Sequence, residues 1–276
     1  MRENRLAAPE GRLAQAILWI LLVLTLIPCV IMLAFSVKDV GQLDHERWTI
    51  LPPFHWENYT AALQAIHGYV WNSILASAGG VVGVLALSAM GGFAFARGRF
   101  RMKELLFYLV IGGMMIPGIL YLVPKFVLFR NFGLLNSRWA LWFPYWTEGQ
   151  IFGIFLVRSS IEALPSDLFQ AAEIDGASVW LRFRHVAIPL IAPVLATLAV
   201  LNVLFTWNDI IWPWLVLTDE SMMTIPIGLV CYRRSFLDLA GPMFAAYTIA
   251  SIPLLLLFAA TSRTFVKGLT SGAFKA

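Results

Sequence analysis

Long apolar runs separated by short polar segments dominate the hydrophobic pattern of this chain. Residues 16–37 contain no charged side chain over 22 positions, and residues 68–96 contain none over 29. A helix needs about 20 mainly apolar residues to cross the hydrocarbon core of a bilayer. Six segments reach or approach this length. The expected spans are residues 16–37, 69–96, 105–124, 139–157, 187–208 and 239–262.

The fourth of these spans is the weakest, because Glu148, Gly149 and Gln150 interrupt its apolar run. We retain it because omitting it would leave an odd number of crossings and would break the charge pattern described below. The prediction is therefore an all-α integral membrane protein in which residues 1–276 form a single transmembrane domain with six transmembrane helices.

Composition supports the same class. Hydrophobic residues make up 59% of the chain and charged residues 13%, whereas soluble domains have about 45–50% and about 25%. The mean hydropathy is +0.76. These values exclude soluble, disordered, collagen-like and disulfide-stapled proteins. A membrane β-barrel is disfavoured as well, because the apolar runs are continuous and longer than the alternating segments of about 10 residues in barrel strands.

The distribution of basic residues predicts the orientation. With six spans and the N-terminus inside, 13 of the 20 Lys and Arg residues lie on the inner side, leaving seven outside. Cytoplasmic loops of membrane proteins carry this excess, so both termini are expected in the cytoplasm. The basic residues lie between the apolar runs, as membrane topology requires. The net charge of +4 therefore does not indicate a nucleic-acid partner.

Several chemistries have no motif in this sequence. There is no G-x-x-x-x-G-K-[ST] phosphate loop, no H-E-x-x-H metal pair and no G-x-S-x-G nucleophile elbow. The four histidines are scattered, and Cys29 and Cys231 lie far apart. We therefore expect no bound cofactor, no metal site, no disulfide framework and no enzymatic activity in this chain.

The inner segment 158–186 is too long for a simple turn, and its first half predicts a short helix. Pro165 suits the first helical turn, where its missing N–H is tolerated. Asp167 and Gln170 have the spacing of a capping box. Gly176 then suits the left-handed position that ends a helix.

The second half of this segment predicts another short helix over residues 179–188. Ser178 can cap it, and Pro189 follows as the chain enters the next span. On these signals alone, an ordinary amphipathic loop lying on the membrane surface is the favoured interpretation.

The order of residues in this segment carries a family resemblance. Gln170 to Ala177 reads Q-A-A-E-I-D-G-A, followed by Trp180, Phe183, Ile188-Pro189 and Pro193. This stretch resembles the EAA loop of ABC importer permeases, which forms a coupling helix that docks on the ATPase subunit. The resemblance assigns an ATPase-coupling role to Gln170, Ala171, Ala172, Glu173, Asp175, Gly176, Ala177, Trp180 and Phe183. The family pattern begins with glutamate, so Gln170 is a departure that removes one charge from the docking surface.

Two further segments narrow the resemblance to the carbohydrate class. Residues 205–214, FTWNDIIWPW, are similar to the end of the fifth span, and residues 265–273, FVKGLTSGA, to the tail of the maltose-type inner subunit. The resemblance implies a type I importer permease in a bacterial or archaeal inner membrane. It also implies a second permease, two ATPase subunits that bind ATP and Mg²⁺, and an extracytoplasmic solute-binding protein.

The candidate solute contacts lie near the end of the fifth span. Amide groups and aromatic faces suit hydroxyl-rich ligands. The candidates are Asn202, Thr206, Trp207 and Asn208. Structural hydrogen bonding and anchoring at the membrane interface are the competing explanations for these residues.

Two other functions remain open from the residues alone. An ion-coupled secondary carrier would usually have paired internal repeats with broken helices, and we find no such pair. A membrane-embedded transferase would need acidic or histidine residues that converge on one site, and none are recognisable in the sequence.

Overall fold

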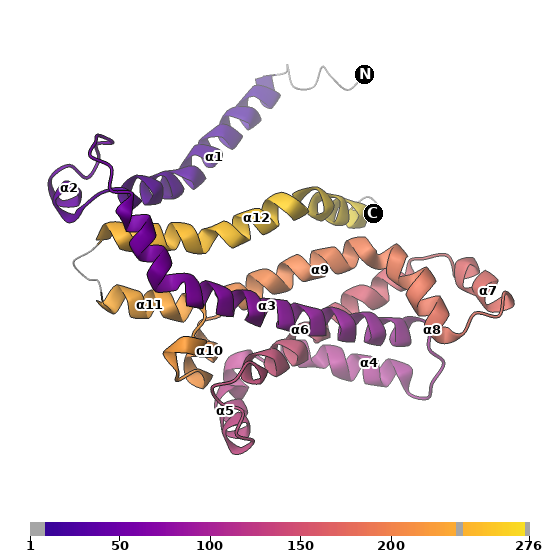
Figure 1. The fold of residues 1–276 in the computed structure, drawn as a ribbon. Helices are drawn as coiled ribbons and strands as arrows, with labels where there is room; N and C mark the ends of the chain where they lie inside the picture. Colours follow the sequence, from indigo (N-terminus) through magenta and orange to yellow (C-terminus); the bar gives the residue numbers. More distant parts are fainter. Residues whose placement is uncertain (1–8, 236–239, 274–276) are drawn as a thin grey trace. The chain divides into compact units, whose positions relative to one another are not determined.

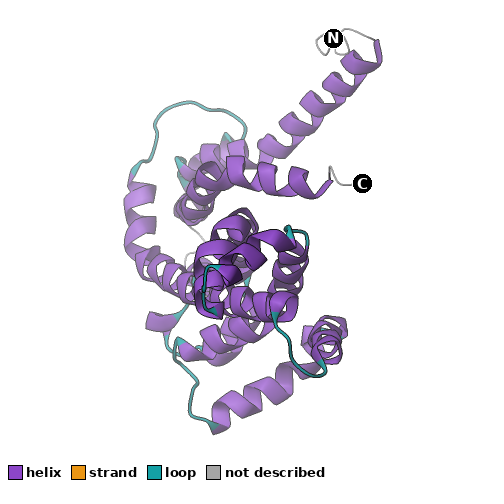
Figure 2. Ribbon diagram, turned by 90° about the vertical axis from the view of Figure 1, so that its right-hand side faces the viewer, coloured by secondary structure: helices purple, strands orange, loops and turns teal. Residues whose placement is uncertain are grey.

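The computed structural model describes residues 9–235 and 240–273. Within these ranges every element is helical, and no strand is present (Figures 1 and 2). The described chain divides into two compact units. One comprises residues 1–67 and 229–252, and the other residues 68–228 and 253–276. The basic residues Arg2, Arg5 and Lys275 lie outside the described ranges, as do the side chains of the tail segment 265–273.

The first unit contains α1 (Pro9–Ser36), α2 (Val40–His45), the beginnings of α3 (Glu57–Arg97) and α12 (Ala240–Ala273), and most of α11 (Ile225–Ser235). The apolar window of α1 has none of its residues buried within the structure. A helix that is apolar on all sides and makes so few contacts needs lipid or another subunit around it. The expected span 16–37 therefore lies within α1, apart from its last residue.

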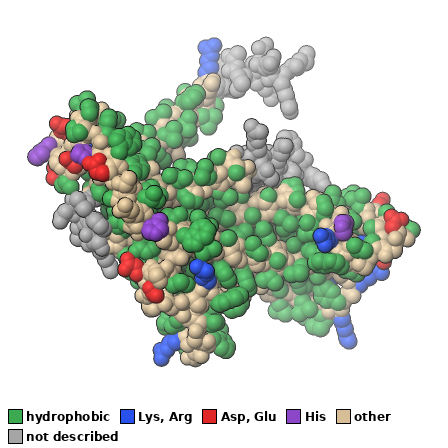
Figure 3. Space-filling view, viewed as in Figure 1, with side chains coloured by type: hydrophobic (Ala, Val, Ile, Leu, Met, Phe, Trp, Pro, Cys, Tyr) green, Lys and Arg blue, Asp and Glu red, His purple; other side chains and the backbone are tan. Residues whose placement is uncertain are grey.

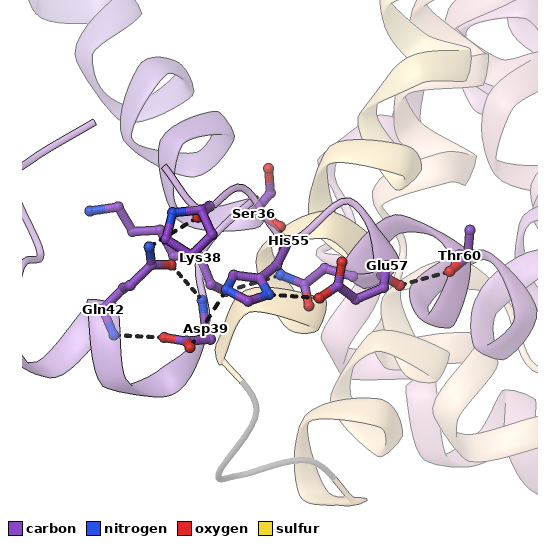
Figure 4. Close-up of polar contacts among 9 residues, drawn as sticks. Ser36, Lys38, Asp39, Gln42, His55, Glu57 and Thr60 are labelled. Atoms are coloured by element: carbon purple, nitrogen blue, oxygen red, sulfur yellow. Dashed lines mark hydrogen bonds and ion pairs between the residues drawn. The ribbon is translucent and has the colours of Figure 1, made fainter. Parts of the chain in front are cut away.

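Polar contacts join α2 to the ends of α1 and α3 in this unit (Figure 4). Lys38 is only 3% exposed, and its Nζ donates to the carbonyl oxygens of Glu46 and Arg47 at 2.6 and 2.9 Å. Asn58 donates to the carbonyls of Ser36 and Lys38, both at 3.0 Å. A capping box of Asp39 and Gln42 starts α2. These bonds give the outer loop expected after the first span a defined fold.

The second unit is built around α6 (Trp139–Glu162), which packs against α3 on one side and α9 (Ile188–Asn208) on another. The glycines of α3 permit the first contact, because a Cβ at Gly79 would collide with Trp142 and one at Gly83 with Trp146. The indole Nε1 of Trp146 also donates to the carbonyl of Gly79 at 2.8 Å. Small residues at helix crossings are the usual means of close packing in membranes.

Gly153 of α6 lies where three helices come close together. A Cβ there would meet Ser88 of α3 and Leu198 of α9 together. We expect Gly153→Ala to destabilise the protein by about 1–3 kcal/mol, because both helices must move apart. Thermal unfolding in detergent measures the effect. Gly112→Ala is the matched control, since a Cβ at Gly112 meets nothing within 4 Å. Equal melting temperatures for the two variants would contradict this packing.

The third expected span, 105–124, is sharply bent rather than continuous. The helical segment Lys103–Met115 and the segment Gly118–Asn131 meet at an angle of 91°. The bend lies at Ile116 and Pro117, where Ile116 has extended backbone angles of −90° and 111°. Proline disfavours helical conformation in the residue before it, which accounts for the break. The second segment contains η3 (Gly118–Tyr121) and α5 (Leu122–Asn131), and the first contains α4 (Lys103–Gly112) and η2 (Gly113–Met115).

Four described helices are long and apolar enough to cross a bilayer, or five if the bent pair counts as one span. The fourth expected span, 139–157, is helical as part of α6, but α6 is not among the helices that qualify by composition. Its Trp, Tyr, Glu148 and Gln150 residues lower its apolar character. Six crossings therefore stay a prediction. The remaining elements are α7 (Ser166–Ile174), α8 (Val179–Arg182), η4 (Phe183–Ala187), α10 (Ile211–Val216) and η5 (Glu220–Met222).

Candidate functional site

The projection between α6 and α9 consists of α7, a tight turn and α8. The turn has the hydrogen bonds of a Schellman motif. The Gly176 N–H donates to the carbonyl of Glu173 at 3.0 Å, and the Ala177 N–H to that of Ala172 at 2.9 Å. Gly176 has φ of +79°, so it occupies the left-handed conformation expected from the sequence. This conformation, together with the two bonds, sets the direction in which α8 leaves α7.

The start of α7 differs from the sequence prediction. Pro165 precedes the helix at the capping position with ψ of 130°, and Ser166 is the first helical residue. The capping box of Asp167 and Gln170 is absent, because no side chain caps this helix. The Asp167 carboxylate instead accepts from the Ser166 hydroxyl at 3.3 Å. Proline already fixes the backbone before the helix, so α7 begins without a side-chain cap.

The second predicted helix, 179–188, is not separate from the following span. Ser178 caps α8 as expected, with its Oγ accepting from the Leu181 N–H at 3.3 Å. The chain then passes through η4, a π-helical turn, directly into α9. Pro189 has no N–H to donate to the preceding turn, and the wider π turn accommodates this loss without ending the helix. The segment from Val179 to Asn208 is thus one helix of 30 residues.

Two aromatic side chains anchor the projection. Phe169 of α7 and Phe183 of η4 are 5% and 8% exposed, and both pack on Phe93 of α3. The ring centroids of Phe93 and Phe183 are 5.3 Å apart, and those of Phe93 and Phe169 are 6.4 Å apart. Phe183 therefore lies in the core under the projection, whereas the resemblance placed it with the docking residues.

Arg97, which the sequence analysis did not single out, ties three helices together at the same place. Its Nη2 donates to the carbonyls of Ile161 and Leu164 at 3.1 and 3.0 Å, so it closes the end of α6. Its guanidinium carbon lies 4.3 Å from the centroid of the Phe169 ring. The last residue of α3 thus holds both α6 and α7. Basic residues at helix ends are common, so the sequence alone could not identify this partner.

An ion pair fixes α7 to α8 across the turn. Glu173 Oε2 and Arg182 Nη1 are 2.6 Å apart. Glu173 therefore keeps an internal partner. The Asp175 carboxylate has no hydrogen bond or ion pair within the described parts of the chain. Of the acidic groups near the turn, Asp175 is the one without a bonding partner among the described residues.

Most of the predicted coupling residues face outward from this anchored base. Gln170, Ala171, Glu173, Asp175, Gly176 and Trp180 are exposed, whereas Ala172 and Ala177 are half-buried. Apolar side chains accompany them, with Ile174 86% exposed and Trp180 58% exposed. A rigid projection that combines exposed apolar groups with a free carboxylate has the composition of a protein-docking surface.

The candidate solute residues of α9 are mostly inaccessible. Asn202, Thr206 and Trp207 are buried. The Thr206 hydroxyl lies 2.9 Å from Ser77 Oγ of α3, and Asn202 Nδ2 donates to the carbonyl of Leu198 at 2.9 Å. These two side chains join or support helices. Asn208 is exposed, and its amide donates to the carbonyl of Leu204 at 2.7 Å.

The structure brings together a polar cluster that the sequence did not reveal. It has three charged side chains and two tyrosines, and is here called the Lys125 cluster (Lys125, Glu148, Asp209, Tyr121 and Tyr145). Lys125 Nζ lies 2.7 Å from Glu148 Oε1, and their side chains are 16% and 27% exposed. Tyr145 donates to Asp209 Oδ2 at 3.1 Å. Lys125 Nζ also lies 5.4 Å from the Tyr121 ring centroid. The residues of the Lys125 cluster come from η3, α5, α6 and the position after α9, so only the fold brings them together.

No group of three or more His, Cys, Asp or Glu residues suited to a metal ion occurs in the described part of the chain. Two features of the described structure are candidates for function: the exposed α7–α8 projection and the partly buried Lys125 cluster. The long apolar helices of the described chain define an integral membrane protein of the all-α class.

The chain belongs to the family described as the binding-protein-dependent transport system inner membrane component, which matches residues 79–271, well over half of its length. It is similar to the diacetylchitobiose uptake system permease protein NgcG of Streptomyces coelicolor, with 31% identity covering 98% of this chain and 92% of the relative. It is also 27% identical to the maltose/maltodextrin transport system permease protein MalG of Vibrio parahaemolyticus, covering 94% and 93% of the two chains.

The fold has a counterpart among solved structures. A bacterial ABC transporter involved in the import of the acidic polysaccharide alginate has a chain that matches with a TM-score of 0.78. The match covers 96% of this chain and 98% of the other at 21% identity. This likeness establishes the fold of a permease subunit, which confirms the all-α membrane class predicted from the sequence.

Proposed function

We propose that this chain is a permease subunit of an ATP-driven importer for a sugar or sugar-like solute delivered by an extracytoplasmic binding protein. A second permease and two ATPase subunits complete the complex, and ATP with Mg²⁺ binds to the ATPase subunits. Both termini face the cytoplasm of a bacterial or archaeal cell. The sugar relatives support the substrate class, since their names include diacetylchitobiose and maltose systems.

The observation that carries this proposal is the α7–α8 projection, anchored on Phe93 and exposed around Asp175. In this proposal the projection docks on an ATPase subunit. Trp180 and Ile174 supply apolar contact, and Asp175 meets a basic or amide group. Gln170 supplies a hydrogen bond without charge. Glu173 keeps α7 and α8 aligned through Arg182 rather than serving mainly as a contact.

We place solute contacts at the Lys125 cluster and Asn208, and assign Asn202, Thr206 and Trp207 to the packing around them. Ionisable side chains in a membrane protein face a water-filled cavity or a partner, because lipid cannot solvate them. Carboxylates can accept hydrogen bonds from the hydroxyl groups of a sugar, and the Tyr121 ring offers an apolar face.

Reconstitution tests the proposed function. We expect no ATP hydrolysis by the isolated chain, because no phosphate-binding loop occurs in its sequence. Hydrolysis and uptake should appear when the second permease, the ATPase subunits and the loaded binding protein are present in proteoliposomes. Liposomes without ATP, but with a sodium or proton gradient, are the control for an ion-coupled carrier. Uptake driven by the gradient alone would overturn the importer proposal.

A further inference from the structure

A basic cavity lies between the end of α3 and the α7–α8 projection. Its volume is about 420 Å³, and its lining includes Arg97, Arg99, Arg182 and Glu173. Three guanidinium groups and one carboxylate give it a formal excess of two positive charges. Figure 3 shows that charged side chains gather at this end of the second unit, whereas apolar side chains cover the helices beside it.

The arginines of this cavity retain unused hydrogen-bonding capacity. Arg97 and Arg182 each keep a buried Nε–H without an acceptor in the described structure. Arg99 is exposed, and its side chain has no hydrogen bond or ion pair to any described residue. Guanidinium groups bind phosphate oxygens in forked geometry, so the chemistry of this lining favours a phosphate group.

An apolar groove follows the same face of α3, farther from the helix end. It has a volume of about 320 Å³ and is lined by residues that include Leu85, Ala86, Met90, Trp180 and Ile188. Positions 86, 90, 94 and 97 are three or four residues apart on α3, and Ala86, Met90 and Ala94 are exposed, so one open stripe joins the groove to the basic cavity.

A phosphate group alone, or an acidic side chain of a partner protein, would occupy the cavity but would have no use for the groove. A lipid uses both, with its head group in the cavity and an acyl chain along the groove. Basic pockets between membrane helices at the cytoplasmic surface are suited to anionic head groups.

We propose that the cavity at Arg97, Arg99 and Arg182, with the groove along α3, is a binding site for an anionic phospholipid. The site rests on the proposed function only in that the end of α3 lies at the cytoplasmic surface. The bound lipid would touch the base of the α7–α8 projection, so it would stabilise the orientation in which the projection meets its partner.

Native mass spectrometry of the purified importer complex tests this site without measuring transport. The probes are dioleoyl phosphatidylglycerol, dioleoyl phosphatidylcholine with the same acyl chains, and inorganic phosphate. We expect Arg99→Gln to weaken phosphatidylglycerol retention about fivefold, as removal of one basic residue near a membrane surface should. Arg101→Gln is the matched control, since Arg101 is exposed in the same loop but does not line the cavity.

A second pair of variants tests the groove. Ala86→Trp should also weaken retention, because Ala86 is exposed and lines the groove, whereas Val82→Trp lies one turn away outside it. Equal retention of the two lipids, or equal effects of Arg99→Gln and Arg101→Gln, would overturn the proposal. Displacement of phosphatidylglycerol by inorganic phosphate, with no effect of Ala86→Trp, would assign the cavity to free phosphate instead. Loss of ATPase subunits from Arg99→Gln with normal lipid retention would assign it to a protein contact.

Discussion

Replacing Gly176 by valine is expected to abolish most ATP-driven uptake while leaving the membrane helices inserted. Gly176 has φ of +79°, and a residue with a Cβ pays about 1–2 kcal/mol in this conformation. A Cβ at this position meets nothing within 4 Å, so the effect comes from the backbone rather than from a collision. Relief of the strain would break the Schellman bonds and turn α8 away from its docking direction. Stimulated ATPase activity and uptake by the complete complex in proteoliposomes provide the measurement.

A second glycine gives this experiment a matched control. Gly133 has φ of +66° and also has nothing within 4 Å of a Cβ, but it follows α5, far from the projection in sequence. Gly133→Val should therefore carry a similar backbone cost and retain coupling. Gly176→Asn should retain more activity than Gly176→Val, because asparagine tolerates the left-handed region. Normal ATPase stimulation and uptake by Gly176→Val would reduce the projection to a surface connector.

Single substitutions of the Lys125–Glu148 pair are expected to destabilise the folded protein strongly. Removing one partner of a largely buried ion pair leaves an uncompensated charge, which costs about 3–5 kcal/mol. Lys125 and Glu148 are 16% and 27% exposed, so we expect values near the lower end for Lys125→Met and Glu148→Leu. Thermal unfolding in detergent measures these losses. Arg130→Met on the same helix, at an exposed position, should change the melting temperature little.

The double variant separates a structural role of this pair from a role in transport. Lys125→Met with Glu148→Leu should recover much of the lost stability, because no unpaired charge remains. If the pair contacts solute, uptake should stay low in this stable variant and the solute concentration for half-maximal uptake should rise. Full recovery of uptake by the double variant would show that the pair serves folding alone.

Local chemistry made parts of this fold predictable from the sequence. A glycine after an amphipathic stretch and a serine before the next one led to the correct conformation of Gly176 and the correct cap at Ser178. These features depend on residues within a few positions of each other. The predicted capping box at Asp167 was wrong because Pro165 had already fixed the backbone at that point. The predicted end of the second helix at residue 188 was wrong because a π turn carries the chain past Pro189.

The remaining features depend on contacts between distant residues. Lys125 and Asp209 are 84 positions apart, yet both belong to one cluster around α6. Arg97 reaches carbonyls at residues 161 and 164. Hydrophobic runs determine that helices form but leave open which face of each helix meets its neighbour. The solute residues were therefore sought along α9, whereas the charged side chains of the Lys125 cluster come mostly from other elements.

The helix from Val179 to Asn208 is continuous, so it can transmit movement through the second unit as a rigid element. Its 30 residues span about 45 Å at the usual rise per residue. Because no loop interrupts this helix, a rotation at Trp180 is transmitted along it toward Asn208, which precedes Asp209 of the Lys125 cluster. The helix departs from regular α-helical geometry in the five residues of the π turn, Phe183–Ala187. In the proposed mechanism, the rigidity of this turn determines how much of a movement at Trp180 reaches Asn208.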